Sequence, residues 1–257
     1  MLRYLKQQVR RFLKRSGLIL VYENQVDPHS LADLTDDEKA TVAVTAERTV
    51  LRPWNVAQLC RCVEYVVRHN IPGAIAECGV WRGGAVLAIL RTLLRLGVTD
   101  RDVFLFDTFD GMSAPTEHDV SWVGEHAPTI HAARGGYASG SNWTRAPLED
   151  VKAGVMSAGY PGDRIRFVQG CVEDTLPAQA PERLALMRLD TVWYESTKHE
   201  LIHLYPRLSQ GGVIIIDDYG TWAGSRRATD EYIGETGARL LLVRSDMTVR
   251  YAVKVDA

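Results

Sequence analysis

The sequence predicts an α/β protein built on a doubly wound, mostly parallel sheet of seven strands. Short apolar runs alternate with helical patterns along most of the 257 residues. Strands of a parallel sheet are buried on both faces and therefore read as continuous apolar segments. Helices between consecutive strands supply the right-handed crossovers that such a sheet requires.

The predicted elements follow one another in a regular order. A polar connector over 27–45 precedes a helical pattern at about 54–69. Five strands are predicted at 74–80, 103–108, 164–170, 184–190 and 212–217, and four further helices at about 83–97, 147–159, 195–208 and 222–236. Two late apolar runs, 240–243 and 251–254, predict a closing hairpin around Asp246.

Residues 51–257 are predicted to form one domain, because a chain of this length can bury a single α/β core. Residues 1–50 form a helical and connecting extension that serves as a lid or an oligomer contact. Residues 113–145 form a long polar insertion between a strand and its helix. Such insertions are usually functional or disordered, and we interpret this one as a lid.

The first 15 residues are basic and amphipathic, with an apolar stripe made of Leu2, Leu5, Val9, Phe12 and Leu13. A monomer would leave this stripe exposed, so we expect it to dock on a second copy of the chain in a dimer or larger homo-oligomer. Binding to a membrane surface is the alternative. The segment lacks the apolar core and cleavage site of a secretory signal.

The composition disfavours several classes of partner. The formal charge of −2 gives no sign of nucleic-acid binding, and no stretch reaches the ~18 apolar residues of a membrane span. The cysteines form neither a CxxC pair nor a zinc-binding spacing. We interpret them as reduced thiols of a cytoplasmic protein; they are Cys60, Cys62, Cys78 and Cys171.

Carboxylates end two of the predicted strands. One strand leads into Asp217 and Asp218, and another ends at Asp190. Adjacent charges at the end of a buried strand are costly to desolvate unless a cation or hydrogen bonds offset them. Ends of parallel strands face the same crevice, so three carboxylates there would suit Mg²⁺ completed by water molecules. The alternative is that Asp217 and Asp218 begin a turn and cap the next helix.

A second group of candidate residues follows the first three strands. Glu77, Gly79 and Gly83 lie between the first strand and its helix, where glycines let the backbone approach a ligand. The spacing does not match GxGxxG and Glu77 would repel phosphate, so a dinucleotide is disfavoured. Glu77 suits an ammonium or hydroxyl groups, as in the methionine end of S-adenosylmethionine. Asp107 is placed for ribose hydroxyls and Asp174 for an adenine amino group, with turn formation and helix capping as alternatives.

Four segments together resemble the macrocin O-methyltransferase family: 76–84, 107–112, 189–197 and 205–220. The resemblance covers about 45–255 and implies a Rossmann-like methyltransferase fold. It also implies methyl transfer from S-adenosylmethionine to a sugar hydroxyl with Mg²⁺, in antibiotic biosynthesis. The implied cofactor-binding residues are Glu77, Gly79, Asp107 and Asp174, and the implied metal ligands are Asp190, Asp217 and Asp218. We count Gly83 and Asp190 among the cofactor-binding candidates as well.

The chain departs from the family at one position. The family pattern is Asp-x-Asp-x-Tyr, and its second aspartate is the expected general base for the sugar hydroxyl. Here Val192 occupies that position, two residues after Asp190. Loss of general-base assistance typically lowers a rate by about 10²–10⁴-fold. The chain is therefore a slow or inactive enzyme, an engineered inactive variant, or an enzyme whose base has moved, with His118, His126 and His131 of the insertion as candidates.

Three functions from different classes remain open at this point. The leading prediction is a Mg²⁺- and S-adenosylmethionine-dependent O-methyltransferase that acts on a sugar or glycoside, with Asp190 positioning the acceptor through the metal. A protein that binds nucleosides or glycans without catalysis is the second. An NAD-dependent oxidoreductase is the third, disfavoured by the absent GxGxxG. Candidates for stacking on a sugar ring are Trp81, Trp122, Trp143, Trp193 and Trp222.

Overall fold

The computed structural model describes residues 31–133 and 144–255 and contains a seven-stranded sheet in the order β3-β2-β1-β4-β5-β7-β6. The first five strands along the chain run parallel, and β7 pairs antiparallel with β5 and β6. This confirms the predicted fold class. The strands are β1 Ala74–Cys78, β2 Val103–Asp107, β3 Ile165–Gln169, β4 Leu184–Leu189, β5 Leu208–Ile216, β6 Val243–Arg244 and β7 Arg250–Val253.

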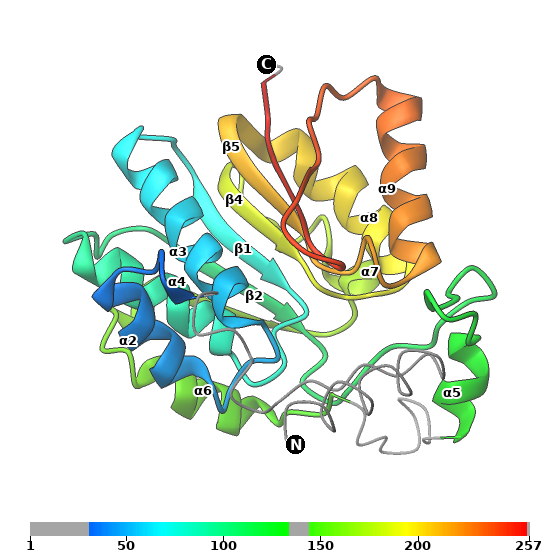
Figure 1. The fold of residues 1–257 in the computed structure, drawn as a ribbon, viewed down its shortest axis with the longest axis horizontal. Helices are drawn as coiled ribbons and strands as arrows, with labels where there is room; N and C mark the ends of the chain where they lie inside the picture. The colour runs from blue at the N-terminus through cyan, green and yellow to red at the C-terminus, as the bar shows by residue number, and fades with distance from the viewer. Residues whose placement is uncertain (1–30, 134–143, 256–257) are drawn as a thin grey trace, which may run out of the picture.

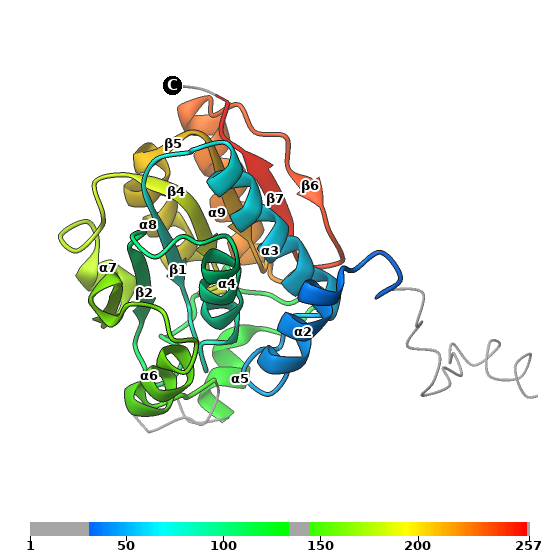
Figure 2. The ribbon, with the colours of Figure 1, turned by 90° about the vertical axis from the view of Figure 1, so that its left-hand side faces the viewer.

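Helices cover both faces of the sheet (Figures 1 and 2). One core lies beneath α3, α4 and α6, and the other beneath α8 and α9. Parallel strands need covering on both faces, and buried side chains of β1, β2 and β4 contribute to both cores. The helices are α2 Asp36–Thr45, α3 Pro53–Arg68, α4 Gly84–Arg95, α5 Ala127–Ala133, α6 Leu148–Met156, α7 Val172–Thr175, α8 Tyr194–Leu204 and α9 Ala223–Thr236.

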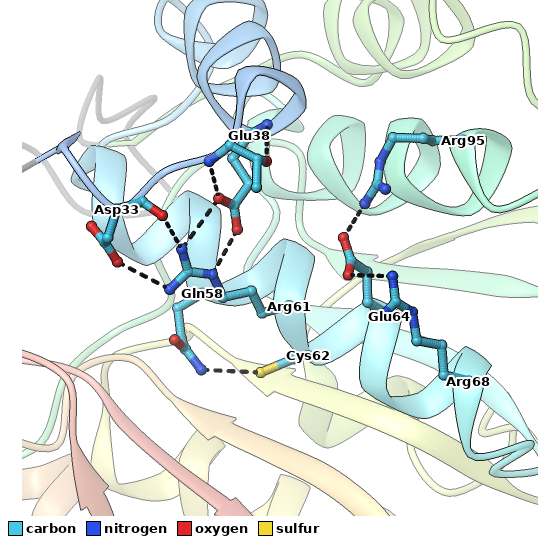
Figure 3. A network of polar contacts seen from close by, with 9 residues as sticks. Asp33, Glu38, Gln58, Arg61, Cys62, Glu64, Arg68 and Arg95 are labelled. Atoms are coloured by element: carbon cyan, nitrogen blue, oxygen red, sulfur yellow. Dashed lines mark hydrogen bonds and ion pairs between the residues drawn. The ribbon is translucent and has the colours of Figure 1, made fainter.

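The prediction of a polar connector over 27–45 is wrong in its second half, because α2 forms there. Thr35 and Glu38 make a capping box: the Glu38 amide donates to the Thr35 hydroxyl at 3.2 Å, and the Thr35 amide donates to the Glu38 carboxylate at 2.7 Å. Arg61 of α3 then pairs with the buried Glu38 at 2.6 Å (Figure 3). The spacing Thr-x-x-Glu was the sequence signal for this helix.

Several boundaries differ from those predicted. The helix expected over 195–208 ends at Leu204, and a 3₁₀ turn at Tyr205–Arg207 follows because Pro206 lacks an amide hydrogen. Strand β5 consequently begins earlier than expected, at Leu208. In the closing hairpin only Val243–Arg244 pairs with β7. The short helices α5 and α7 were not predicted.

No helix among residues 31–133 and 144–255 combines the length and apolarity needed to cross a bilayer. The amphipathic segment 1–15 and Trp143 lie outside the described residues, so the expectations attached to them stay predictions. All four cysteines are free thiols, as the sequence analysis expected.

Candidate active site

A cavity of about 670 Å³ opens at the carboxyl edge of the parallel strands. The strand order reverses there between β1 and β4, and ligands of open α/β sheets bind at such a point. The α2–α3 loop, the β6–β7 turn and part of the insertion complete the wall. Its acidic lining residues are Glu77, Asp107, Glu173, Asp190, Asp217, Asp218 and Asp246.

Arg188 of β4 lies at the centre of this acidic wall and is 3% exposed. Its Nη1 donates to Glu77, its Nη2 donates to Asp217, and the same Nη2 lies 2.8 Å from Asp190 Oδ2. Burying an unpaired guanidinium costs several kcal/mol, and these three carboxylates offset that cost. The sequence analysis did not single out Arg188. A basic residue inside an otherwise apolar strand was the signal that pointed to it.

Glu77 lies opposite Arg188 in the β1–β4 register and is 1% exposed. Arg188 binds Oε1, whereas Oε2 has no hydrogen-bond partner among the described residues. Burial raises the pKa of Glu77 to about 7, with the positive charge of Arg188 acting in the opposite direction. Glu77 therefore presents one uncommitted oxygen at the cavity wall.

The three carboxylates predicted to bind metal all line the cavity. Burial raises the pKa of both Asp190 and Asp218; repulsion from Asp217 adds to this, and Arg188 opposes it. Interaction with the Asp190 side chain also acts to lower the pKa of Asp218.

No group of three His, Cys, Asp or Glu side chains within residues 31–133 and 144–255 is arranged so that it could hold a metal ion. Asp190 and Asp217 both contact Nη2 of Arg188. Three carboxylates contact the Arg188 guanidinium, Asp218 lines the same cavity, and carboxylate oxygens are the ligands that hard cations prefer. The three metal-ligand assignments stay predictions.

Asp107 binds the loop after β1 (Gly79–Gly83). Its Oδ2 accepts hydrogen bonds from the amides of Val80 at 2.6 Å and Trp81 at 3.0 Å, and its Oδ1 accepts from the Phe109 amide at 2.7 Å. These bonds hold the loop in place and leave Asp107 few free lone pairs. Its expected role on ribose hydroxyls is not tested, and its visible role is to shape the loop.

Two glycines of that loop have positive φ, at +81° for Gly79 and +79° for Gly83. A Cβ on Gly79 would lie 2.2 Å from the Asp190 carbonyl oxygen, and one on Gly83 would lie 2.7 Å from Val155 Cγ2. Gly79 therefore permits β1 and β4 to approach beside the cavity, and Gly83 lets α4 pack against α6. Gly79 lines the cavity, and Gly83 is not among its lining residues.

Asp174 is exposed on α7 and is not among the lining residues. Its neighbour Glu173 lines the cavity instead, together with Cys171 and Val172. The adenine contact predicted for Asp174 stays a prediction, and the geometry favours Glu173 for contacts in that part of the cavity.

Val192 lines the cavity directly beyond Asp190, and its φ is +76°. This left-handed conformation is unfavourable for a β-branched residue, because the branch contacts its own backbone, and it costs about 1–3 kcal/mol. Aspartate and asparagine tolerate it better. The backbone therefore retains a conformation that suits the family's aspartate.

The insertion packs against the loop that follows Asp218. The Trp122 amide donates to the Thr221 carbonyl, and the Ala223 amide donates to the Val120 carbonyl, each at 2.8 Å. Asp119 is fully buried and accepts from the Thr116 amide at 2.7 Å and from the Tyr194 amide of α8 at 2.8 Å. The described part of the insertion borders the cavity through Ser113, Thr144 and Arg145.

None of the three candidate histidines of the insertion is among the lining residues. His118 lies beside Arg227, with its Nδ1 3.0 Å from Nη1, and its ring packs against Tyr194. His126 is exposed, and His131 is buried with its Nε2 3.4 Å from the Met112 carbonyl oxygen. The described geometry thus gives no support to a base relocated to these histidines.

Among the predicted tryptophans, Trp81 lines the cavity, whereas Trp122 is 63% exposed. Trp193 is buried and packs edge-on against Trp222, with ring centroids 5.1 Å apart. Its Nε1 donates to the Ser113 carbonyl at 2.9 Å. Trp81 is therefore the best placed of these side chains to contact a bound ligand.

We expect Asp119→Ala to lower the free energy of unfolding by about 2–4 kcal/mol, because it leaves buried amides of the insertion and of α8 without acceptors. Urea denaturation of the variant measures this. Glu117→Ala, at an exposed position in the same segment, is the matched control and should change stability by less than about 0.5 kcal/mol. Equal stabilities for the two variants would contradict the anchoring role.

Comparison with known proteins supplies the family. The family model described as macrocin-O-methyltransferase (TylF) matches residues 7–253. The chain is 40% identical over 176 residues to 8-demethyl-8-(2,3-dimethoxy-alpha-L-rhamnosyl)-tetracenomycin-C 4'-O-methyltransferase of Streptomyces olivaceus, which covers 68% of this chain and 64% of that protein. It is 35% identical over 202 residues to mycinamicin III 3''-O-methyltransferase of Micromonospora griseorubida, covering 79% of this chain and 76% of the relative.

A solved structure agrees with these sequence relatives. The O-methyltransferase NovP superposes with a TM-score of 0.71 at 29% identity, covering 81% of this chain and 83% of NovP. The first relative is matched over less than two thirds of its length, since 64% of it is covered. The family model nevertheless spans nearly the whole chain, and the resemblance stated from sequence is confirmed: this chain belongs to the macrocin O-methyltransferase family of enzymes.

Proposed function

We propose that the chain is a Mg²⁺- and S-adenosylmethionine-dependent O-methyltransferase that acts on a hydroxyl of a sugar or glycosylated natural product in antibiotic biosynthesis. One observation carries this proposal. Glu77, Asp190 and Asp217 contact the same guanidinium, and all three line one cavity at the switch point of the sheet together with Asp218. The binding sites for the methyl donor and for the acceptor would then lie side by side in this cavity.

The donor side fits S-adenosylmethionine. The buried Glu77 Oε2 without a hydrogen-bond partner would accept from the ammonium group of the methionine moiety, which carries hydrogen-bond donors and positive charge. The glycine loop held by Asp107 would form the floor beside it, and Glu173 would border the nucleoside part. S-adenosylmethionine supplies an electrophilic methyl group on a sulfonium sulfur.

The acceptor side fits a divalent cation bound by Asp190, Asp217 and Asp218, since they carry more negative charge than Arg188 offsets. Mg²⁺ would supply Lewis acidity that lowers the pKa of an acceptor hydroxyl. The carboxylates would orient the acceptor through that cation, and Val80 and Trp81 would exclude water on the donor side. No side chain at position 192 is able to accept the hydroxyl proton.

The names of the relatives support a sugar hydroxyl as the acceptor, since they describe transfer to the 4' position of a rhamnosyl tetracenomycin and to the 3'' position of mycinamicin III. The cavity volume is consistent with a cofactor and part of a glycoside. We propose sugar hydroxyls as the class of acceptor.

A methyl-transfer assay with labelled S-adenosylmethionine and a panel of glycoside acceptors tests the function. We expect labelled product to form with Mg²⁺ and to fall at least about tenfold after chelation, with recovery on adding Mg²⁺ back. Calorimetric titration with S-adenosylhomocysteine and with NAD, without an acceptor, should show binding of the former alone. Product formation that is unaffected by chelation would contradict the metal role and leave the donor assignment intact.

A second candidate is a catalytically impaired enzyme or a protein that binds nucleosides or glycans without turnover. Val192 favours it, because valine occupies the cavity wall where the family carries a base. Binding of S-adenosylhomocysteine without product from any acceptor would support this candidate.

We also propose that the protein is a cytoplasmic homo-oligomer. The apolar stripe in the sequence of the first 15 residues supports the oligomer, and the four free thiols support a reducing compartment. Light scattering tests the oligomeric state, and a monomeric mass would contradict it.

A further inference from the structure

The strongest feature that the proposed function does not use is the buried guanidinium of Arg188. Among the described residues, it is the one cation that pairs with Glu77, which is proposed to bind the methyl donor, and also with Asp190 and Asp217, which are proposed to bind the metal ion. The register of the sheet creates this arrangement: Arg188 lies opposite Glu77 in β1 and opposite Ile215 in β5, two residues before Asp217. Asp190 follows on the same face of β4.

The contacts of the guanidinium are divided between its two terminal nitrogens. Nη1 binds Glu77 Oε1 and thereby leaves Oε2 as the unbound oxygen. Nη2 is shared by Asp190 and Asp217. A planar guanidinium holds its nitrogens at fixed separation, so the positions of the three carboxylates become linked. A lysine ammonium is a compact point charge without this fork and could not reach both sides in the same way.

A stabilising role alone does not account for this arrangement. A buried ion pair is often replaceable by packed apolar residues without loss of stability, and three carboxylates contact one guanidinium here. Glu77, Asp190 and Asp217 all line the cavity, and Glu77 Oε2 is buried without a hydrogen-bond partner. Arg188 instead contacts the carboxylates that are proposed to bind ligands, where it would orient them.

We propose that Arg188 is a positioning residue that holds the donor-binding carboxylate Glu77 and the cation-binding carboxylates Asp190 and Asp217 in one rigid frame. The proposal rests on the proposed function, because it assumes a donor at Glu77 and a cation at the aspartates. Arg188 lines the cavity, and its role in this proposal runs through the carboxylates that it contacts. It acts by presenting Glu77 Oε2 to the donor and by fixing the spacing between donor and cation sites.

The test measures binding rather than turnover. Calorimetry determines the affinities for S-adenosylhomocysteine and, separately, for Mg²⁺ in the wild type and in Arg188→Lys. We expect the variant to lose about tenfold or more in both affinities, because one ammonium cannot hold both sets of carboxylates. Arg101→Lys is the matched control, since Arg101 donates to the Ile71 and Gly73 carbonyls at the opposite edge of the sheet. It should lower thermal stability while both affinities stay within about twofold.

A double-mutant cycle separates positioning from general loss of structure. In the Glu77→Gln background, Arg188→Lys should lower S-adenosylhomocysteine affinity by less than about twofold, while its effect on Mg²⁺ affinity persists. An effect of Arg188→Lys on donor binding that is the same in both backgrounds would overturn the proposal, as would unchanged affinities in the single variant.

A wild-type protein that binds no S-adenosylhomocysteine would refute the proposed function itself. Wild-type binding without any effect of Arg188→Lys would refute the positioning role alone.

Discussion

Replacement of Val192 by aspartate is expected to raise methyl transfer about 100-fold or more, with little change in S-adenosylhomocysteine affinity. The new carboxylate would stand at the cavity wall two residues after Asp190 and accept the proton of the acceptor hydroxyl. The backbone is already in a left-handed conformation that costs aspartate less than valine, so the loop needs no rearrangement. Single-turnover kinetics with a fixed acceptor measure the effect.

Val192→Asn is the control that separates proton transfer from backbone strain. Asparagine tolerates a φ of +76° as aspartate does, and both variants should gain about 1 kcal/mol in free energy of unfolding. Asparagine cannot act as a base, so its turnover should match that of the parent. If both variants accelerate turnover equally, strain and not the missing base limits the parent. If neither does, the binding-protein candidate gains support.

The second large effect is expected at Asp107. Its carboxylate accepts from three backbone amides, so Asp107→Ala should lower the free energy of unfolding by about 3 kcal/mol or more and release the loop that carries Val80 and Trp81. S-adenosylhomocysteine affinity should fall by about tenfold or more, because the loop borders the donor site. Urea denaturation and calorimetry measure the two effects.

Asp110→Ala is the matched control for that experiment. Asp110 lies three residues farther along the chain, and its ion pair with Arg145 at 2.8 Å is about half exposed on both sides. Such a pair contributes about 0–1 kcal/mol, so the control should keep its stability and its donor affinity. A donor affinity that survives in Asp107→Ala would show that the loop does not shape the donor site.

Much of the fold could be predicted from short segments of the sequence. The mostly apolar runs ending at Cys78, Leu189 and Ile216 predicted buried parallel strands, because apolar side chains occupy both faces of each run. The acidic residues after those runs were predictable as neighbours, since the carboxyl ends of parallel strands meet at one edge. The family resemblance followed from the same segments, and the comparisons confirmed it.

Helix α2 was not predicted from the sequence, although the residues that indicate it lie next to one another in the chain. The polar residues around Thr35 resembled a connector, and the apolar pattern was too weak to identify a helix. The capping box and the ion pair with Arg61 stabilise it instead. Its packing against α3 then depends on a residue 23 positions away in the chain.

The chain by itself determined the order of its strands and helices, the acidic edge of the sheet and the absence of a base at position 192. These properties depend on residue type and spacing. Only the tertiary structure decided that Asp107 binds the loop after β1, that Glu173 rather than Asp174 lines the cavity, and that Arg188 joins Glu77 to Asp190 and Asp217. Each of these depends on which strands lie side by side and in what register, and strand register is set by packing between residues far apart in the sequence.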